Sequence, residues 1–107
     1  MVSNKFSIVS IIFIFLWLIP LSGAVEYPSP SGYVNDFAHM LSPVDIARLN
    51  DEITAIEKDT TVEIAIVTVD SLQGVSVEEY AVKLFEKWGI GKKEKDNGLL
   101  ILVSKND

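Results

Sequence analysis

Apolar residues between Pro43 and Lys58 recur with the period of an α-helix. They lie three or four positions apart, which places them on one helical face: Ile46, Leu49, Ile53 and Ile56. Ser42 supplies a hydroxyl suited to an N-cap, and a proline follows at the first helical position. The pattern therefore predicts a helix from Pro43 to about Lys58.

A second amphipathic stretch follows Ser76 and has the same kind of beginning. Ser76 is followed by Val77, Glu78 and Glu79, an arrangement typical of a capped helix N-terminus. The apolar face of this stretch consists of Ala81, Leu84, Phe85 and Trp88. Gly89 suits the left-handed residue that ends many helices. We therefore expect a helix from Val77 to about Trp88.

Two runs of strand length are apolar at almost every position. Residues 62–69 are rich in β-branched side chains, and residues 98–103 contain no polar side chain. The run of residues 62–69 suits a strand buried on both faces, which favours a parallel sheet, and residues 98–103 form a second apolar run of strand length. The order helix, strand, helix, strand predicts an α/β fold, a partial three-layer sandwich with a parallel βαβ unit preceded by a helix. Two helices leave part of such a sheet uncovered, so we expect either further strands or a partner, including self-association through the uncovered sheet surface.

The first 24 residues have the composition of a secretory signal peptide. Lys5 is the only charge before the apolar run of residues 6–21, and this run is shorter than the ~20 residues of a membrane-spanning helix. Small residues at Ser22 and Ala24 predict cleavage after Ala24; an uncleaved membrane anchor is the alternative. Residues 25–32, which are rich in proline and serine, are interpreted as a linker before the domain at 33–107.

Composition limits the partners and the compartment. All 15 acidic side chains follow residue 24, and the whole chain has a net charge of −6. An acidic chain repels phosphate backbones, so nucleic acid is excluded as an expected partner. The chain contains no cysteine, so the core must stabilise the domain without a disulfide. We expect an exported protein that is periplasmic, extracellular or membrane-associated.

Three aspartates are candidate ligands for a metal ion. Asp70 and Asp107 follow the two predicted parallel strands, so they should share one edge of the sheet, and Asp36 precedes the first helix at the same edge. Oxygen ligands of this kind suit Ca²⁺ or Mg²⁺. The alternative is that Asp36 and Asp70 are turn and cap residues that serve the backbone. The single histidine, His39, and the lack of a nucleophile motif identify no catalytic residues.

The segment from Trp88 to Val103 resembles the TPM-domain family. The matching residues are Trp88-Gly89-Ile90-Gly91-Lys92-Lys93 and then Lys95-Asp96-Asn97-Gly98, followed by the apolar strand. Residues 33–38, 41–43 and 76–81 agree with the same family in order and spacing. The family includes thylakoid-lumen photosystem II repair proteins and exported bacterial proteins. The resemblance implies that residues 33–107 form a TPM-like domain that is incomplete at its C-terminus.

The resemblance also implies two functions. One is an accessory protein that acts outside the cytoplasm near the membrane, with a membrane or a membrane-protein complex as its partner, in membrane-protein maintenance or assembly. The alternative is a metal-dependent acid phosphatase in which Asp36, Asp70 and Asp107 hold the cation. We favour the accessory function because the sequence offers no evident general base, and no basic residues near the acidic edge to hold phosphate.

Overall fold

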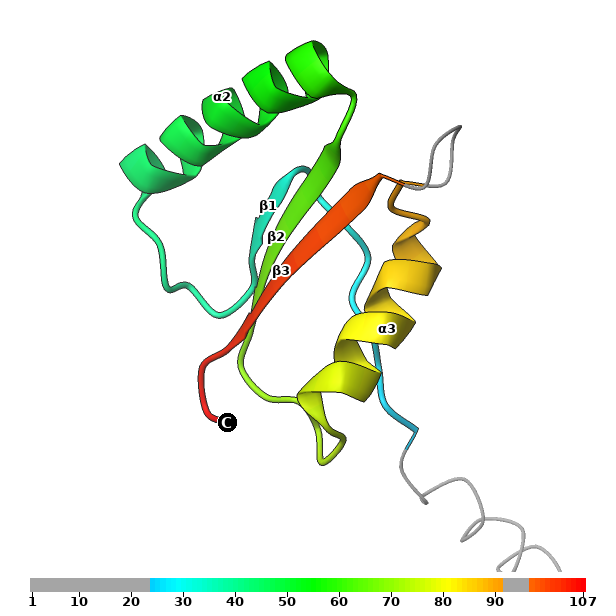
Figure 1. Ribbon diagram of the computed structural model, residues 1–107. Helices are drawn as coiled ribbons and strands as arrows, with labels where there is room; N and C mark the ends of the chain where they lie inside the picture. The colour runs from blue at the N-terminus through cyan, green and yellow to red at the C-terminus, as the bar shows by residue number, and fades with distance from the viewer. Residues whose placement is uncertain (1–23, 92–96) are drawn as a thin grey trace, which may run out of the picture.

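The described part of the protein forms a three-stranded parallel sheet with one helix on each face (Figure 1). The computed structural model describes residues 24–91 and 97–107. The elements are β1 (Val34–Asp36), α2 (Pro43–Thr60), β2 (Glu63–Val69), α3 (Val77–Trp88) and β3 (Gly98–Ser104), and the strands lie in the order β1-β2-β3. This arrangement confirms the predicted α/β fold class with its parallel βαβ unit. The predicted signal peptide, apart from Ala24, and most of the charged loop after Gly91 lie outside the described residues.

The short strand β1 is an addition to the predicted order of elements. It pairs in parallel with β2, with Val34 opposite Ile66 and Asp36 opposite Thr68. The amide of Ile66 donates to the carbonyl of Tyr33 at 2.8 Å, which extends the contact by one residue. Three residues are too few to show an alternating pattern, so the sequence contained no periodic evidence for this strand.

Both helices begin and end with the predicted chemistry. The hydroxyls of Ser42 and Ser76 each accept a hydrogen bond at 3.1 Å from the backbone amide three residues later. Gly89 ends α3 with φ 64°, in the left-handed region where a residue without a Cβ meets no steric penalty. Helix α2 ends at Thr60, two residues beyond the predicted end. Its C-cap residue has the left-handed conformation and is Thr61, not a glycine.

The central strand β2 separates two hydrophobic clusters. On one face Val67 and Val69 pack with Leu72, Tyr80 and Leu84, which belong to α3 and to the loop before it. On the other face Val34, Ile53 and Ile64 form a cluster beneath α2, extended by partly buried neighbours: Leu41, Ile46, Leu49, Val62 and Ile66. The prediction that residues 62–69 form a strand buried on both faces is confirmed.

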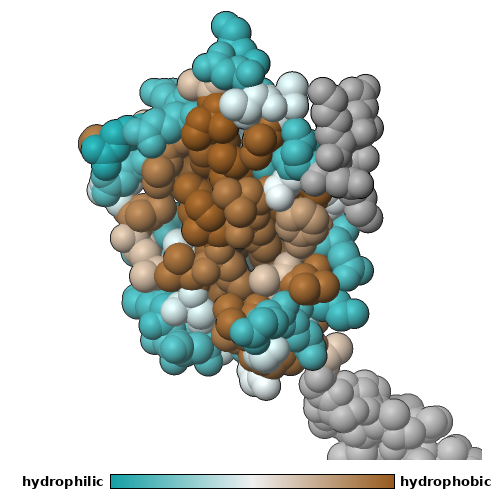
Figure 2. Space-filling model, viewed as in Figure 1, coloured by the Kyte–Doolittle hydropathy of each residue, from teal (hydrophilic) through white to brown (hydrophobic). Residues whose placement is uncertain are grey.

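Strand β3 lies at the edge of the sheet and is covered on one face only. Its side chains alternate between partly buried and exposed. The exposed ones lie on the α2 face and retain 49% (Leu99), 43% (Ile101) and 39% (Val103) of their accessible surface. Figure 2 shows the resulting apolar surface between the two helices. The expected uncovered apolar surface is therefore present, and it lies on β3.

Candidate functional site

The ends of the three parallel strands bring the predicted site residues to one edge of the sheet. Asp36 ends β1, Asp70 follows β2, and Asp107 lies three residues after β3. The register pairs Val69 with Ser104, so β2 and β3 end side by side. Open α/β sheets bind ligands at this edge, which makes it the candidate functional site.

Asp36 uses its carboxylate to hold the loop between β1 and α2. Its oxygens accept hydrogen bonds from the amides of Met40 at 2.9 Å and Leu41 at 3.0 Å, and from the hydroxyl of Thr68 at 2.6 Å. Desolvation acts to raise the pKa of Asp36, but these three hydrogen bonds, assisted by nearby His39, hold its pKa below the ordinary value. Asp36 is therefore an ionised group that stabilises the loop.

Thr68 connects the same loop to the central strand. Its hydroxyl donates to Asp36 and accepts from the amide of Ala38 at 3.1 Å. Thr68 is only 3% exposed, so this hydroxyl is a buried polar group with both a donor and an acceptor partner. Sequence reasoning did not identify this residue, because a threonine inside an apolar run is also a common strand former.

Asp107 joins the end of β3 to the loop after β2. Its Oδ2 atom accepts from the hydroxyl of Ser104 at 2.7 Å and from the amide of Leu72 at 2.8 Å. The hydrogen bond from Ser104 and then that from Leu72 lower the pKa of Asp107. Like Asp36, this carboxylate accepts a backbone hydrogen bond that holds a loop. The alternative interpretation predicted such a role for Asp36 and Asp70, and the structure extends it to Asp107.

Asp70 takes part in the same loop contacts through its backbone. Its carbonyl oxygen accepts from the amide of Asn106 at 3.1 Å and from the side-chain amide of Asn106 at 2.8 Å. The Asp70 side chain is exposed, and no hydrogen bond to its carboxylate occurs among the residues that the structure describes. Of the three predicted ligands, Asp70 is the one that remains open to an added group.

The three aspartates share an edge but do not form a metal cage. Within residues 24–91 and 97–107, no group of three or more histidine, aspartate or glutamate side chains is placed to hold a metal ion. Two of the three carboxylates are also committed to hydrogen bonds. The residues in this arrangement therefore do not fit a three-carboxylate Ca²⁺ or Mg²⁺ site, and cation binding by this edge stays a prediction of the sequence.

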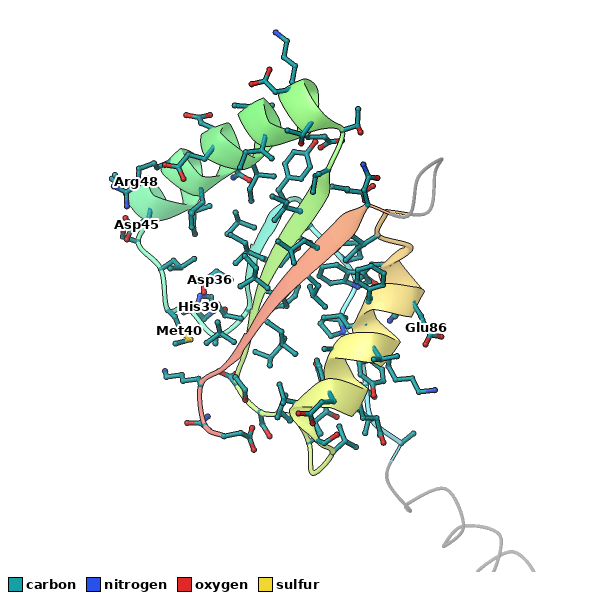
Figure 3. All side chains as sticks on the ribbon, viewed as in Figure 1. Asp36, His39, Met40, Asp45, Arg48 and Glu86 are labelled. Atoms are coloured by element: carbon teal, nitrogen blue, oxygen red, sulfur yellow. The ribbon has the colours of Figure 1, made fainter. Side chains whose placement is uncertain are left out.

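The loop after β1 carries the single histidine and leads to an ion pair. Figure 3 shows Asp36, His39 and Met40 on this loop, with Asp45 and Arg48 at the start of α2. His39 is exposed and has φ 52°. Arg48 and Asp45 are 2.9 Å apart, but both side chains face solvent, so their pairing contributes little to stability. His39 is therefore an exposed residue of this loop.

An open pocket of about 420 Å³ lies beside this edge on the α3 face. Aromatic rings form much of its lining, from Tyr27, Phe37 and Tyr80, and the carboxylate residues Glu26 and Asp70 also line it. The rings of Tyr27 and Tyr80 lie 4.8 Å apart at an angle of 55°, a favourable tilted arrangement. Burial, followed by the proximity of Tyr27, raises the pKa of Tyr80.

The segment before β1 builds one wall of this pocket. Glu26 and Gln73 exchange two hydrogen bonds, at 3.1 and 2.8 Å, between backbone and side chain. The indole nitrogen of Trp88 donates to the carbonyl of Pro28 at 2.8 Å, and Lys87 donates to the carbonyl of Tyr27. The sequence did not indicate these contacts, because a segment with two prolines shows no periodicity. Val25 and Tyr27 are the residues of this segment that could have indicated contact with the core.

Comparison with known proteins identifies the family. The model of the TPM domain matches residues 34–107. The chain belongs to the TPM-domain family. A solved structure, the N-terminal domain of a protein from P. gingivalis determined by solution NMR, is 32% identical with a TM-score of 0.58. The match covers 66% of this chain and 46% of that one, so this TPM domain spans just under half the length of its relative. No curated protein matches the chain.

Proposed function

We propose that this TPM-domain protein is an exported accessory protein that acts outside the cytoplasm near the membrane, in the maintenance or assembly of membrane proteins. It acts by binding a protein partner at the carboxyl edge of its sheet and not by catalysis. Family membership and the apolar segment of residues 6–21 support this proposal. Among the described residues, neither helix is long and apolar enough to cross a membrane.

The observation that carries the proposal is the engagement of Asp36 and Asp107. A general base or a metal ligand needs a carboxylate oxygen with a free lone pair aimed at the reacting group. Here Asp36 accepts three hydrogen bonds and Asp107 accepts two, all from groups that hold the loops of this edge. Both carboxylates therefore hold the loops of this edge in place, and Oδ1 of Asp107 accepts no hydrogen bond from the described residues. Carboxylates used in this way support a binding edge over a catalytic one.

The pocket beside the edge indicates the chemistry of the partner. Its lining is mainly aromatic and aliphatic, and the carboxylates of Glu26 and Asp70 are its acidic groups. An apolar side chain next to a basic one would satisfy both parts of this lining. The proposed partner is thus a segment of a membrane protein that presents such a pair of side chains.

Enzyme assays separate this proposal from a phosphatase. The purified protein is incubated with a phosphate ester in the presence of Mg²⁺ or Ca²⁺, beside the variants Asp70→Asn and Asp51→Asn. We expect no hydrolysis above the protein-free blank in any of the three. Metal-dependent turnover that is lost in Asp70→Asn and kept in Asp51→Asn would contradict a noncatalytic function. Asp51 is an exposed residue of α2, so its variant controls for the loss of one negative charge.

Calorimetric titration with Ca²⁺ tests the predicted cation site with the same three proteins. The site lies at this edge if Ca²⁺ gives heat of binding and a higher melting temperature in the unmodified protein and in Asp51→Asn, but not in Asp70→Asn. No heat in the unmodified protein would remove the prediction of a metal site and leave the proposed binding function in place.

The export part of the proposal is tested on the protein from its own cells. Cell fractionation should place it outside the cytoplasm, and N-terminal sequencing should begin at Val25. A cytoplasmic product that still begins at Met1 would contradict export.

A further inference from the structure

Residues 24–30, which we call the strap, run alongside α3 (Figure 1). Pro28 and Pro30 fix their own φ angles at about −65° and favour extended conformations for the residues before them. An extended segment of this kind forms no hydrogen bonds within itself, so its backbone depends on other parts of the molecule or on water.

Three consecutive carbonyl oxygens of the strap each accept a hydrogen bond from a side chain of α3 or of the loop before it. The pairs are Glu26 with Gln73 at 2.8 Å, Tyr27 with Lys87, and Pro28 with the indole nitrogen of Trp88 at 2.8 Å. Domains that bind proline-containing peptides hold them in aromatic-lined grooves. The contacts of the strap are of this kind, because side-chain donors bind its backbone and an aromatic residue is one of the donors.

The conformation of Gln73 suits this contact. Its φ is 57°, a value that few residues other than glycine adopt, and its amide donates to the hydroxyl of Ser71 at 3.0 Å. Its side chain pairs with both backbone groups of Glu26, since it also accepts from the amide at 3.1 Å. Strained backbone is found most often where a side chain is positioned for binding. The loop therefore presents Gln73 to the backbone of the strap.

The ring of Tyr27 is the main apolar anchor of the strap. It lies 4.8 Å from the ring of Tyr80, and Val25 joins it against the same hydrophobic cluster. Tyr80 is 1% exposed, so its ring is a fixed part of the α3 face. The α3 face thus holds an aromatic residue that is followed by proline on an extended backbone.

The strap is held less firmly than the residues that follow it. Its contact with the hydrophobic core comes from Val25 and Tyr27, which are both only partly buried. Asn35, by contrast, is 1% exposed, and its side chain forms hydrogen bonds of 2.7 to 3.0 Å with Ser31 and Gly32. This buried clamp ends the strap, so we expect residues 24–30 to leave α3 by local opening while β1 stays in place.

We propose that this side of α3 is a binding site for an extended segment of a partner protein, one that presents an aromatic residue followed by proline. The strap is the occupant of the site within the chain, and the partner segment displaces it. Because the partner segment makes the same contacts, it also rebuilds the wall of the pocket beside the carboxyl edge. The inference goes beyond the proposed function, since this site can bind such a segment whether or not the edge binds a partner.

A fluorescent synthetic peptide with the sequence of residues 24–30 tests the site by anisotropy on the full chain. Val25→Ser/Tyr27→Ser removes both apolar anchors of the strap, so it should bind the peptide about fivefold or more tightly than the unmodified protein, because more of the site is vacant. Ser29→Ala, at an exposed position of the strap, should bind like the unmodified protein. A control peptide with serine in place of the tyrosine and both prolines should bind the double variant about fivefold or more weakly.

Substitutions on α3 test the donors of the site in the same double variant. Trp88→Phe keeps an aromatic ring and removes the indole N–H, so it should weaken peptide binding by about threefold to tenfold. Glu86→Gln is the matched control, because Glu86 is an exposed residue of the same helix that points away from the sheet in Figure 3. It should leave peptide binding unchanged.

Hydrogen exchange of the unmodified protein, labelled with ¹⁵N, tests displacement without any substitution. The amide of Glu26 donates to Gln73, and the amide of Ile66 donates to Tyr33 within the sheet. Relative to their intrinsic rates, the Glu26 amide should exchange about tenfold or more faster than that of Ile66. Saturating unlabelled peptide should accelerate exchange at Glu26 and not at Ile66, because the peptide replaces the strap alone.

Three results would overturn the proposal. The first is a double variant that is folded by circular dichroism and binds the peptide no more tightly than the unmodified protein. The second is equal binding of the two peptides. The third is a Glu26 amide as protected as that of Ile66 even with saturating peptide, which would make the strap a permanent part of the fold. If the double variant does not fold, the exchange measurement decides alone.

Discussion

The two faces of the sheet differ in how completely they are covered. On one face α3 and residues 24–30 together cover β2 and part of β3, and Tyr27 extends the cluster around Tyr80. On the other face α2 contacts β1 and β2 and leaves the outer side chains of β3 exposed. A helix is about 10 Å wide and strands are about 4.8 Å apart, so one helix covers about two strands. A three-stranded sheet needs a second covering segment on each face, and only the α3 face has one within the described residues.

Neighbouring residues of β3 show the consequence most directly. Leu100 and Leu102 are partly buried against the α3 cluster, whereas Leu99 and Ile101 are exposed on the other face. The residue types are nearly the same on both faces, so their local sequence does not set the difference. It depends on which distant segments lie over each face.

The largest expected effect comes from truncation on the covered face. Leu84 is 0% exposed, so Leu84→Ala should reduce the free energy of unfolding by about 2–5 kcal/mol through lost burial and a cavity. Ile101→Ala on the open face should cost about 1 kcal/mol or less, because the side chain already meets water. Urea denaturation at submicromolar protein concentration gives both values. Equal losses at the two positions would refute the difference between the faces.

Weakening the contact between residues 24–30 and the α3 face should reduce stability by an intermediate amount. Tyr27→Ala removes the tilted contact with Tyr80 and opens the pocket, so we expect a loss of roughly 1–2 kcal/mol. Ser29→Ala, an exposed position in the same segment, should change little. Thermal unfolding of both variants measures the difference. An unchanged melting temperature for Tyr27→Ala would show that residues 24–30 do not stabilise the α3 face.

An effect of similar size concerns the loop beside the α2 face. Asp36→Asn should lower stability at neutral pH by about 1–2 kcal/mol, because an amide cannot accept all three hydrogen bonds that the carboxylate accepts. Asp51→Asn serves as the exposed control.

The pH dependence of stability checks the same group with a definite sign. The folded-state pKa of Asp36 is lowered, so its contribution is complete above the ordinary aspartate pKa of about 3.9 and is lost as the pH falls through the lower folded value. Asp36→Asn should therefore lose less stability on acidification than the unmodified protein. Parallel acid-unfolding curves for the two proteins would refute the assignment.

Several elements were predictable because their evidence is local. The cap residues Ser42, Ser76 and Gly89 gave correct helix ends, apart from the two extra residues of α2, and the two apolar runs gave β2 and β3 to within one residue. The shared edge of Asp36, Asp70 and Asp107 also followed from the parallel strand order. The family resemblance placed residues 33–107 in the TPM domain, and the family match covers residues 34–107.

Other features depended on contacts that the sequence did not reveal. Strand β1 is too short to show a period, and it exists because β2 offers it hydrogen bonds. The roles of Asp36 and Asp107 depend on donors that the fold brings to them, among them Thr68 and Leu72. The local sequence around a loop aspartate is the same whether the carboxylate binds a cation or caps a turn. Only the positions of the hydrogen-bond donors distinguish the two roles.

The sequence by itself determined the helices, the two long strands, their parallel arrangement and the acidic edge, because periodicity, caps and strand order are properties of the chain read in order. Only the tertiary structure decided that residues 24–30 pack beside α3 on one face of the sheet, that two of the three edge carboxylates accept hydrogen bonds from the loops, and that β3 is exposed on the other face. These outcomes depend on segments tens of residues apart in sequence meeting in space, and the energy of such contacts is not encoded in any local pattern.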